Sequence, residues 1–288
     1  MRSKGSTAVL GGNEMGLREK AIEMSEIYRK NPKIEAIILA GSVARKLEDE
    51  HSDIELHILW SEPPEDEDRK EPINHIGGEI LSYYPYEEEE WSETYLTKEG
   101  IKLEISNFLT VTVEKIISEV VERYDINYEK QCIVSSIHDG VSLYGEVKVH
   151  TLKDRVEAYP EELAQKMIAE NLWLSNRWHN REALLKRKDW LMLYDVICEV
   201  QRNIFGVLFG LNRMYVHHPA FKWMPYNVER MGIKPENLYE RMANILIGHP
   251  ENSVKELELL MGEVLHLVKQ YTPELNIAEQ QKRIQYAK

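Results

Sequence analysis

Two short apolar segments joined by a Gly-Ser turn constrain the fold of this chain more than any other feature. Residues 34–40 (IEAIILA) form an almost continuous apolar run, which predicts a buried strand. Residues 53–60 (DIELHILW) alternate between polar and apolar side chains, so Asp53 and Glu55 would share one face of a second strand. Ten residues separate this pair from the turn at residues 41–42. The N-terminal part should therefore contain a sheet with a polar face and an apolar face.

The pattern of the chain changes near residue 150. Before it, strands are expected at residues 78–84, 93–97 and 101–110, with an acidic loop at residues 61–69 and a hairpin turn at residues 98–100. After it, apolar spacings of three and four predict helices around residues 161–186, 189–215, 236–247 and 251–270. We expect an α+β fold, in which a domain with a mixed sheet (1–148) precedes a helical bundle domain (149–288).

The overall charge of the chain makes nucleic acid an unfavourable partner and small cations favourable ones. Lys and Arg number 36 and Asp and Glu 49, which gives a net charge of −13. A strongly acidic protein does not favour broad binding to nucleic acid backbones, whereas it attracts small cationic molecules. The sequence has no apolar run of 18 residues and no signal peptide, so we expect a cytoplasmic protein without a membrane partner.

Three acidic residues form the strongest candidate site. Asp53 and Glu55, two apart on a strand, would place their carboxylates roughly 6.5 Å apart along the chain. Glu104 lies in a later segment with the same alternation, so a neighbouring strand would bring it beside them. Taken alone, an acidic pair on a strand is an ordinary solvated face. Three clustered carboxylates, however, repel one another unless cations neutralise them, and magnesium prefers such oxygen ligands.

The Gly-Ser turn adds a feature suited to phosphate. Gly41 allows the backbone to turn tightly and to approach a ligand. Ser42 would begin a short helix, whose free amide groups favour a phosphate. Arg45 lies one turn further on and could add positive charge. His51 and His57 flank the acidic pair, and we interpret both as local hydrogen-bonding partners.

These motifs resemble those of the polymerase-β-like nucleotidyltransferases. The family pattern is Gly-Ser or Gly-Gly, about ten residues, and then Asp-x-Asp or Asp-x-Glu between apolar residues. This chain matches it at residues 40–42 and 53–56. The Asp-Ile-Glu variant is most similar to kanamycin nucleotidyltransferase and its bacterial relatives, and residues 102–108 (KLEISNF) resemble the strand that carries their third carboxylate. The resemblance covers about the first 150 residues well and the helical half loosely.

The resemblance implies transfer of AMP from ATP to an acceptor hydroxyl, with release of pyrophosphate. Asp53, Glu55 and Glu104 would bind two magnesium ions, and Glu104 would complete the catalytic metal site or help to activate the hydroxyl. Gly41 and Ser42 would hold the β and γ phosphates. Arg45 is assigned to the same phosphates, as is Arg177 of the helical half. The acceptor would be a small molecule such as an aminoglycoside-like antibiotic.

One position departs from the family pattern. Trp173 falls where the family has a glutamate proposed as general base, and tryptophan cannot accept a proton. Glu170 would have to substitute, or Glu104 would act alone. Kanamycin nucleotidyltransferase shares its active sites between two subunits, so the resemblance leaves a homodimer open as well.

Two alternatives keep the same fold. A protein hydroxyl could be the acceptor, as in AMPylating enzymes, although such members are usually minimal domains without a helical half. The chain could instead be a catalytically silent nucleotide-binding module, which the missing glutamate leaves open.

Overall fold

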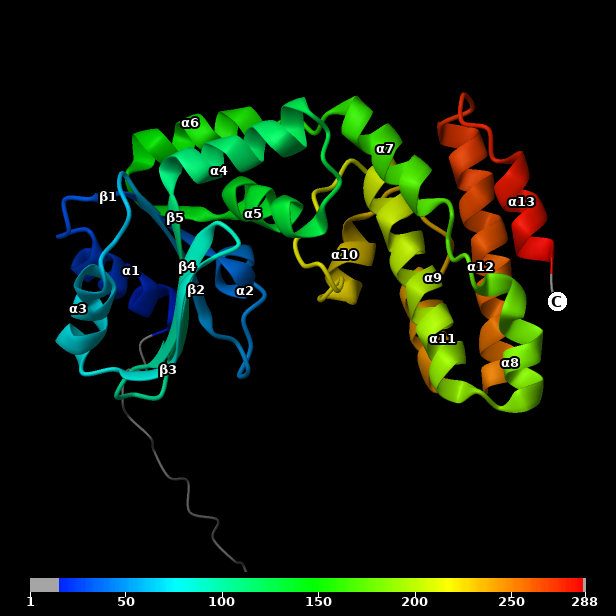
Figure 1. The fold of residues 1–288 in the computed structure, drawn as a ribbon, viewed down its shortest axis with the longest axis horizontal. Coiled ribbons are helices and arrows are strands. Elements are labelled where there is room, and N and C mark those ends of the chain that lie inside the picture. Colours follow the sequence, from blue (N-terminus) through cyan, green and yellow to red (C-terminus); the bar gives the residue numbers. More distant parts are fainter. Residues whose placement is uncertain (1–15, 287–288) are drawn as a thin grey trace, which may run out of the picture. The chain divides into compact units, whose positions relative to one another are not determined.

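The computed structural model describes residues 16–286, and six strands of this part form one sheet in the order β3-β4-β5-β2-β1-β6 (Figure 1). The strands are β1 (Ile34–Ala40), β2 (Ile54–Trp60), β3 (Glu79–Glu87), β4 (Glu90–Leu96), β5 (Lys102–Leu109) and β6 (Val141–Tyr144). Only the β2–β5 pair is parallel among them, and the others are antiparallel. This mixed sheet, together with the helices described below, confirms the predicted α+β class.

One face of the sheet is the buried core predicted from the alternation. Four apolar residues of β2 point to this face and are fully buried: Ile54, Leu56, Ile58 and Trp60. Helices α1 (Leu17–Tyr28) and α3 (Asp66–Ile76) pack on them through Met24 and Ile73 (Figure 1). The opposite face carries the polar residues of β2.

The register between β2 and β5 positions the acids. Glu55 lies opposite Glu104, and Leu56 lies opposite Ile105. On the other side of β2, Glu55 lies opposite Ala40, the last residue of β1. Because side chains alternate along a strand, a slip of one residue would replace Glu104 by an apolar residue on this face.

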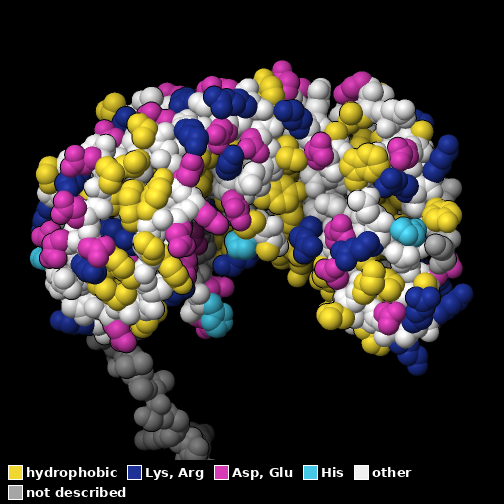
Figure 2. Space-filling model, viewed as in Figure 1, with side chains coloured by type: hydrophobic (Ala, Val, Ile, Leu, Met, Phe, Trp, Pro, Cys, Tyr) yellow, Lys and Arg dark blue, Asp and Glu magenta, His cyan; other side chains and the backbone are white. Residues whose placement is uncertain are grey.

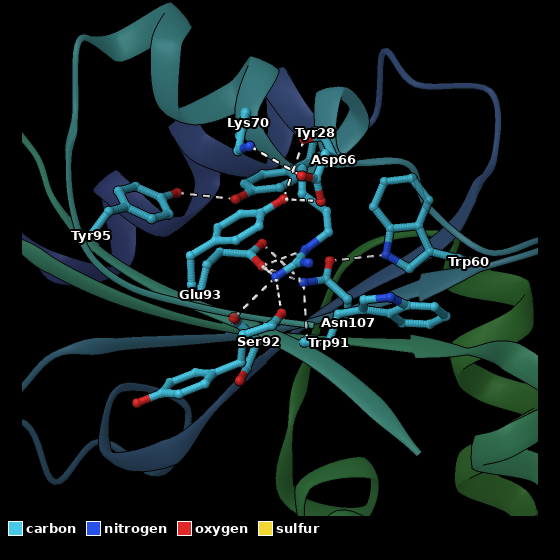
Figure 3. A network of polar contacts seen from close by, with 12 residues as sticks. Tyr28, Trp60, Asp66, Lys70, Trp91, Ser92, Glu93, Tyr95 and Asn107 are labelled. Carbon is cyan, nitrogen blue, oxygen red and sulfur yellow. Dashed lines mark hydrogen bonds and ion pairs between the residues drawn. The ribbon is translucent and has the colours of Figure 1, made fainter. Parts of the chain in front are cut away.

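A buried polar network on the core face connects α3 to the strands (Figure 3). Arg69 donates to Glu93 over 2.6 and 2.8 Å, and both residues are 1% exposed. Asn107 donates to both oxygens of Glu93 at 2.9 and 3.0 Å, and its own oxygen accepts from the Trp60 indole at 2.9 Å. Arg69 also donates to the carbonyl of Tyr84 at 2.9 Å. The network therefore links β2, β3, β4 and β5 at one register.

The acidic loop expected at residues 61–69 is wrong in its second half, because α3 begins at Asp66. Glu65 and Asp68 form a capping box there, each accepting from the other's backbone N–H. Acidic residues in the first turn of a helix also interact favourably with the helix dipole. The acidic residues at 65–68 therefore mark the start of a helix and not a loop.

The glutamate run between the predicted strands is a tight turn. Glu87 pairs with Glu90, while Glu88 and Glu89 have φ values of 51° and 70°. Residues 98–100 form the predicted hairpin turn between β4 and β5, with Gly100 at φ +82°. In the strand order, β3 lies at the edge of the sheet, a position that tolerates its Pro85.

The chain forms two compact units. The first consists of residues 16–112 and 139–150 and contains the sheet, and the second consists of residues 113–138 and 151–286. The remaining helices are α2 (Gly41–Arg45), α4 (Thr110–Ile117), a π-helical turn (Ser118–Glu122), α5 (Tyr128–Asp139), α6 (Glu146–Val156), α7 (Glu161–Asn171), a 3₁₀ turn (Trp178–Asn180), α8 (Arg181–Arg187), α9 (Trp190–Leu211), α10 (Met224–Arg230), α11 (Leu238–Ile247), α12 (Pro250–Tyr271) and α13 (Ala278–Gln285). The functional division at residue 148 stays a prediction.

The helix expected over residues 161–186 is interrupted. Helix α7 ends at Asn171, and Leu174 adopts a left-handed φ of 56°. The side chain of Asn203, from α9, donates to the freed carbonyl of Leu174. A tertiary contact therefore replaces the helical hydrogen bond at this break.

The C-terminal helix is clamped within the second unit. Arg181, which is 3% exposed, donates to the carbonyls of Ile284 at 3.1 Å and Tyr286 at 2.7 Å. Its guanidinium also pairs with Glu258 at 3.2 Å. These contacts hold α13 against α12 and the 3₁₀ turn.

Charged side chains of both signs are mixed on the surface of the face drawn in Figure 2. On the face shown in Figure 2, Lys and Arg side chains are interspersed with Asp and Glu rather than gathered into a stripe. Within residues 16–286, every helix is too short or too polar to serve as a membrane span.

Candidate metal site

Three carboxylates meet where β1, β2 and β5 run side by side. One oxygen from each of Asp53, Glu55 and Glu104 lies within 4.8 Å of the other two. Glu55 and Glu104 are paired across the strands, and Asp53 directly precedes β2. The structure thus brings together the three acids that the sequence singled out.

The donor set suits a divalent cation. All three side chains are partly exposed, so a hydrated ion could reach them. At 4.8 Å, each pair of unit charges repels by roughly 1 to 3 kcal/mol, depending on the effective dielectric constant. Carboxylate oxygens at this spacing are ligands that magnesium favours. The residues present therefore fit a magnesium site.

The Gly-Ser turn is fitted closely to this cluster. Gly41 has φ +64°, and a Cβ atom built on it would lie 2.4 Å from both Cδ and Oε1 of Glu55. Only glycine satisfies both constraints, the left-handed backbone and the close approach. Ser42 follows in α2 and is 7% exposed. The turn therefore places its backbone directly against one carboxylate.

A lysine that the sequence analysis did not single out completes the cluster. The ammonium of Lys102 lies 3.0 Å from Oδ2 of Asp53 and also donates to Oε1 of Glu104. These hydrogen bonds, that to Glu104 above all, raise the pKa of Lys102 above its ordinary value. The i, i+2 spacing between Lys102 and Glu104 was the available signal, because both residues must share a strand face.

The two arginines assigned to phosphate have other partners in the structure. Arg45 donates to Asp139 at 3.0 Å and to the carbonyl of Gly41 at 3.3 Å. Its side chain is 7% exposed. Arg177 belongs to the second unit, where it pairs with Asp195 at 2.8 Å and Glu199 at 3.0 Å. It lies in the segment between α7 and α8, not on a long helix.

The positions near the missing general base lie at the end of α7. Trp173 follows the helix and is 41% exposed, with the guanidinium of Arg283 stacked 4.5 Å from its ring centre. Glu170 is exposed on the last turn of α7. Both belong to the second unit.

His57 does not act as the hydrogen-bonding partner that was expected. Both ring nitrogens are inaccessible to solvent, and neither has a hydrogen-bond partner among the described residues. Burial, with a contribution from Arg45, lowers the pKa of His57 to about 4. On the same face, burial raises the pKa of Glu90 to about 7, against the opposing effect of its hydrogen bond with Ser106.

Comparisons with known proteins find a family model and solved structures that are similar to this chain. A family model described as a domain of unknown function (DUF4037) matches residues 126–224. An aminoglycoside 6-adenyltransferase from Bacillus subtilis is similar in structure over 92% of this chain and 96% of that one, with 12% identity and a TM-score of 0.38. The Cid1 poly(U) polymerase is similar over 43% of this chain and 42% of that one, with 13% identity and a TM-score of 0.25. No curated protein matches the sequence.

Those two structures are an adenyltransferase and a polymerase. Because both TM-scores lie below 0.5, the chemistry of the site has to be derived from this chain's own residues.

Proposed function

We propose that this protein is a magnesium-dependent nucleotidyltransferase that moves AMP from ATP to a hydroxyl group of a small acceptor and releases pyrophosphate. The convergence of Asp53, Glu55 and Glu104 within 4.8 Å, with the Gly41 backbone against Glu55, carries the proposal. A metal site beside a glycine turn is the arrangement that phosphoryl chemistry needs, because catalysis there depends on positioning and charge neutralisation.

The proposed roles follow from the positions of the side chains. Asp53 and Glu55 would hold the magnesium ions together with Glu104. Two bound magnesium ions supply charge stabilisation for the attacking and leaving oxygens. Glu104, whose side chain is 44% exposed, would also accept the proton of the acceptor hydroxyl. Gly41 and Ser42 would contact the β and γ phosphates.

The acceptor is proposed to be a cationic small molecule of the aminoglycoside type. The net charge of −13 favours such a ligand over an anionic one. Arg45 and Arg177 would assist at the phosphates only by exchanging their present acidic partners. A cytoplasmic location and a homodimer stay predictions.

Pyrophosphate release tests the function. Each nucleoside triphosphate is supplied with magnesium, with and without a panel of aminoglycosides, lincosamides and hydroxyl-bearing metabolites. The test variant is Asp53→Asn with Glu55→Gln, and the matched control is Glu87→Gln with Glu88→Gln, which removes the same charge at the β3–β4 turn. We expect acceptor-dependent release in the wild type and the control, and none in the test variant.

Other outcomes separate the alternatives. Nucleotide-dependent labelling of a protein by AMP would favour a protein acceptor. Binding of magnesium and nucleotide without turnover would favour a silent nucleotide-binding module, which the paired states of Arg45 and Arg177 make a specific second candidate. A folded protein that binds neither magnesium nor nucleotide would refute the metal site.

A further inference from the structure

A cation that belongs to the chain lies between two of the three carboxylates. Lys102 and Glu104 are two residues apart on β5, and Asp53 precedes the neighbouring strand β2. The Lys102 ammonium contacts Asp53 at 3.0 Å and donates to Glu104 as well. It therefore bridges two elements that are distant in sequence, at the place where a shared metal ion would bridge them.

We infer that Lys102 is a resident counter-ion, which holds the carboxylates together in the metal-free protein and is displaced when a divalent ion binds. The inference rests on the proposed metal site and concerns its regulation. Asp53, Glu55 and Glu104 repel one another, and one ammonium neutralises part of their charge. The metal-free site is thus kept assembled by the chain itself.

Displacement follows from the competition for the same oxygens. Magnesium binds carboxylate oxygens at about 2.0–2.1 Å and needs their lone pairs directed at it. An ammonium that hydrogen-bonds Asp53 and Glu104 uses lone pairs of those same groups, and a second cation beside it would be repelled. Lys102 and the ion therefore exclude each other from the position between Asp53 and Glu104.

The lysine is held loosely enough to leave. Its side chain is 40% exposed, and those of Asp53 and Glu104 are 22% and 44% exposed. Ion pairs at such exposure stabilise a structure only weakly, and a lysine stem can swing its charge into water. Lys102 is thus a positioning residue that sets the affinity for the metal without preventing its binding.

The test is Mn²⁺ binding in the absence of nucleotide, measured by calorimetry and by loss of the free-ion electron paramagnetic resonance signal. Lys102→Met should bind Mn²⁺ about tenfold more tightly than the wild type, because each exposed ion pair that the ion must break reduces its affinity by up to roughly fivefold. Lys102→Arg keeps the charge and should bind no more tightly than the wild type.

The control variant is Lys98→Met. Lys98 lies in the preceding hairpin turn with its side chain over Gly77, so the change removes the same charge away from the carboxylates. It should leave the Mn²⁺ affinity unchanged. If Lys102→Met does not fold, Lys102→Gln removes the charge and retains a hydrogen-bond donor, and should also bind the ion more tightly.

Two further results have distinct meanings. Equal or weaker Mn²⁺ binding by the folded Lys102→Met and Lys102→Gln variants would overturn the counter-ion role, while the metal site itself would stand. No Mn²⁺ binding by any folded variant, including the wild type, would overturn the proposed metal site and the counter-ion role with it.

Discussion

Substitution of Gly41 by alanine should distinguish the contribution of this residue to metal binding from its contribution to the stability of the fold. The new Cβ would lie 2.4 Å from Cδ and Oε1 of Glu55, where ordinary contact begins at 3.4 Å. The Glu55 carboxylate must therefore move by 3.4 − 2.4 = 1.0 Å or more. The left-handed φ of +64° adds a backbone strain of about 1–2 kcal/mol for any residue with a Cβ.

Gly100→Ala is the matched control. Gly100 has a similar φ of +82°, but a Cβ there meets nothing within 4 Å. Both variants should lose about 1–2 kcal/mol of unfolding free energy in metal-free buffer, measured by chemical denaturation. Only Gly41→Ala should lose metal affinity, by about 100-fold, since a ligand misplaced by this amount no longer completes the site.

Calorimetric titration with Mn²⁺ decides the question. Wild-type affinity in Gly41→Ala, with the strain energy observed in both variants, would refute the idea that the turn is shaped around Glu55. Equal losses of metal affinity in both variants would show that strain alone, transmitted through the sheet, accounts for the effect.

Four further predictions concern the two units separately. Arg69→Met should destabilise the protein by about 3–5 kcal/mol in chemical denaturation, because it leaves Glu93 buried and unpaired, and adding Glu93→Leu should recover part of the loss. The contribution of His57 to stability, measured as the difference between the wild type and His57→Leu, should fall by about 3 kcal/mol as the pH drops from 6.5 towards 4, since unfolded His57 gains a proton before the folded form does. The contribution of Glu90 has the opposite sign: measured as the difference between the wild type and Glu90→Gln, it should fall as the pH rises from 4.5 through 7, because the folded protein prefers protonated Glu90. Arg181→Met should expose α13 to limited proteolysis while the first unit stays resistant.

The sequence was sufficient to predict the sheet face and its acids. A period of two places Asp53 and Glu55 together, and the same period at Glu104 suggests a neighbouring strand. That β5 lies directly beside β2, in parallel and with Glu104 opposite Glu55, could not be predicted, because register depends on pairing across the intervening hairpin. Lys102 was missed although its spacing to Glu104 placed it on the same face.

The errors in the helical parts have physical causes. The segment 161–186 contains no Gly or Pro, so nothing local marked the break at Leu174, which a side chain from α9 stabilises. The start of α3 lies in an acidic run, and the sequence pattern alone does not distinguish acidic residues that cap a helix from acidic residues that only face solvent. Arg45 pairs with Asp139, and Arg177 pairs with Asp195. No sequence pattern reveals these partners, so the assignment of both arginines to phosphate could not take them into account.

The buried network and the carboxylate cluster share a strand, and this has a consequence for how the protein can change during evolution. Asn107 and Glu104 lie three residues apart on β5 and so face opposite sides of the sheet. If β5 slipped against both neighbouring strands, Glu104 would move away from Glu55, and Asn107 would move away from Glu93 and Trp60, whose polar groups would stay buried without these partners. Selection for a stable chain therefore preserves the geometry of the carboxylates by itself, even in descendants that have changed acceptor or lost turnover.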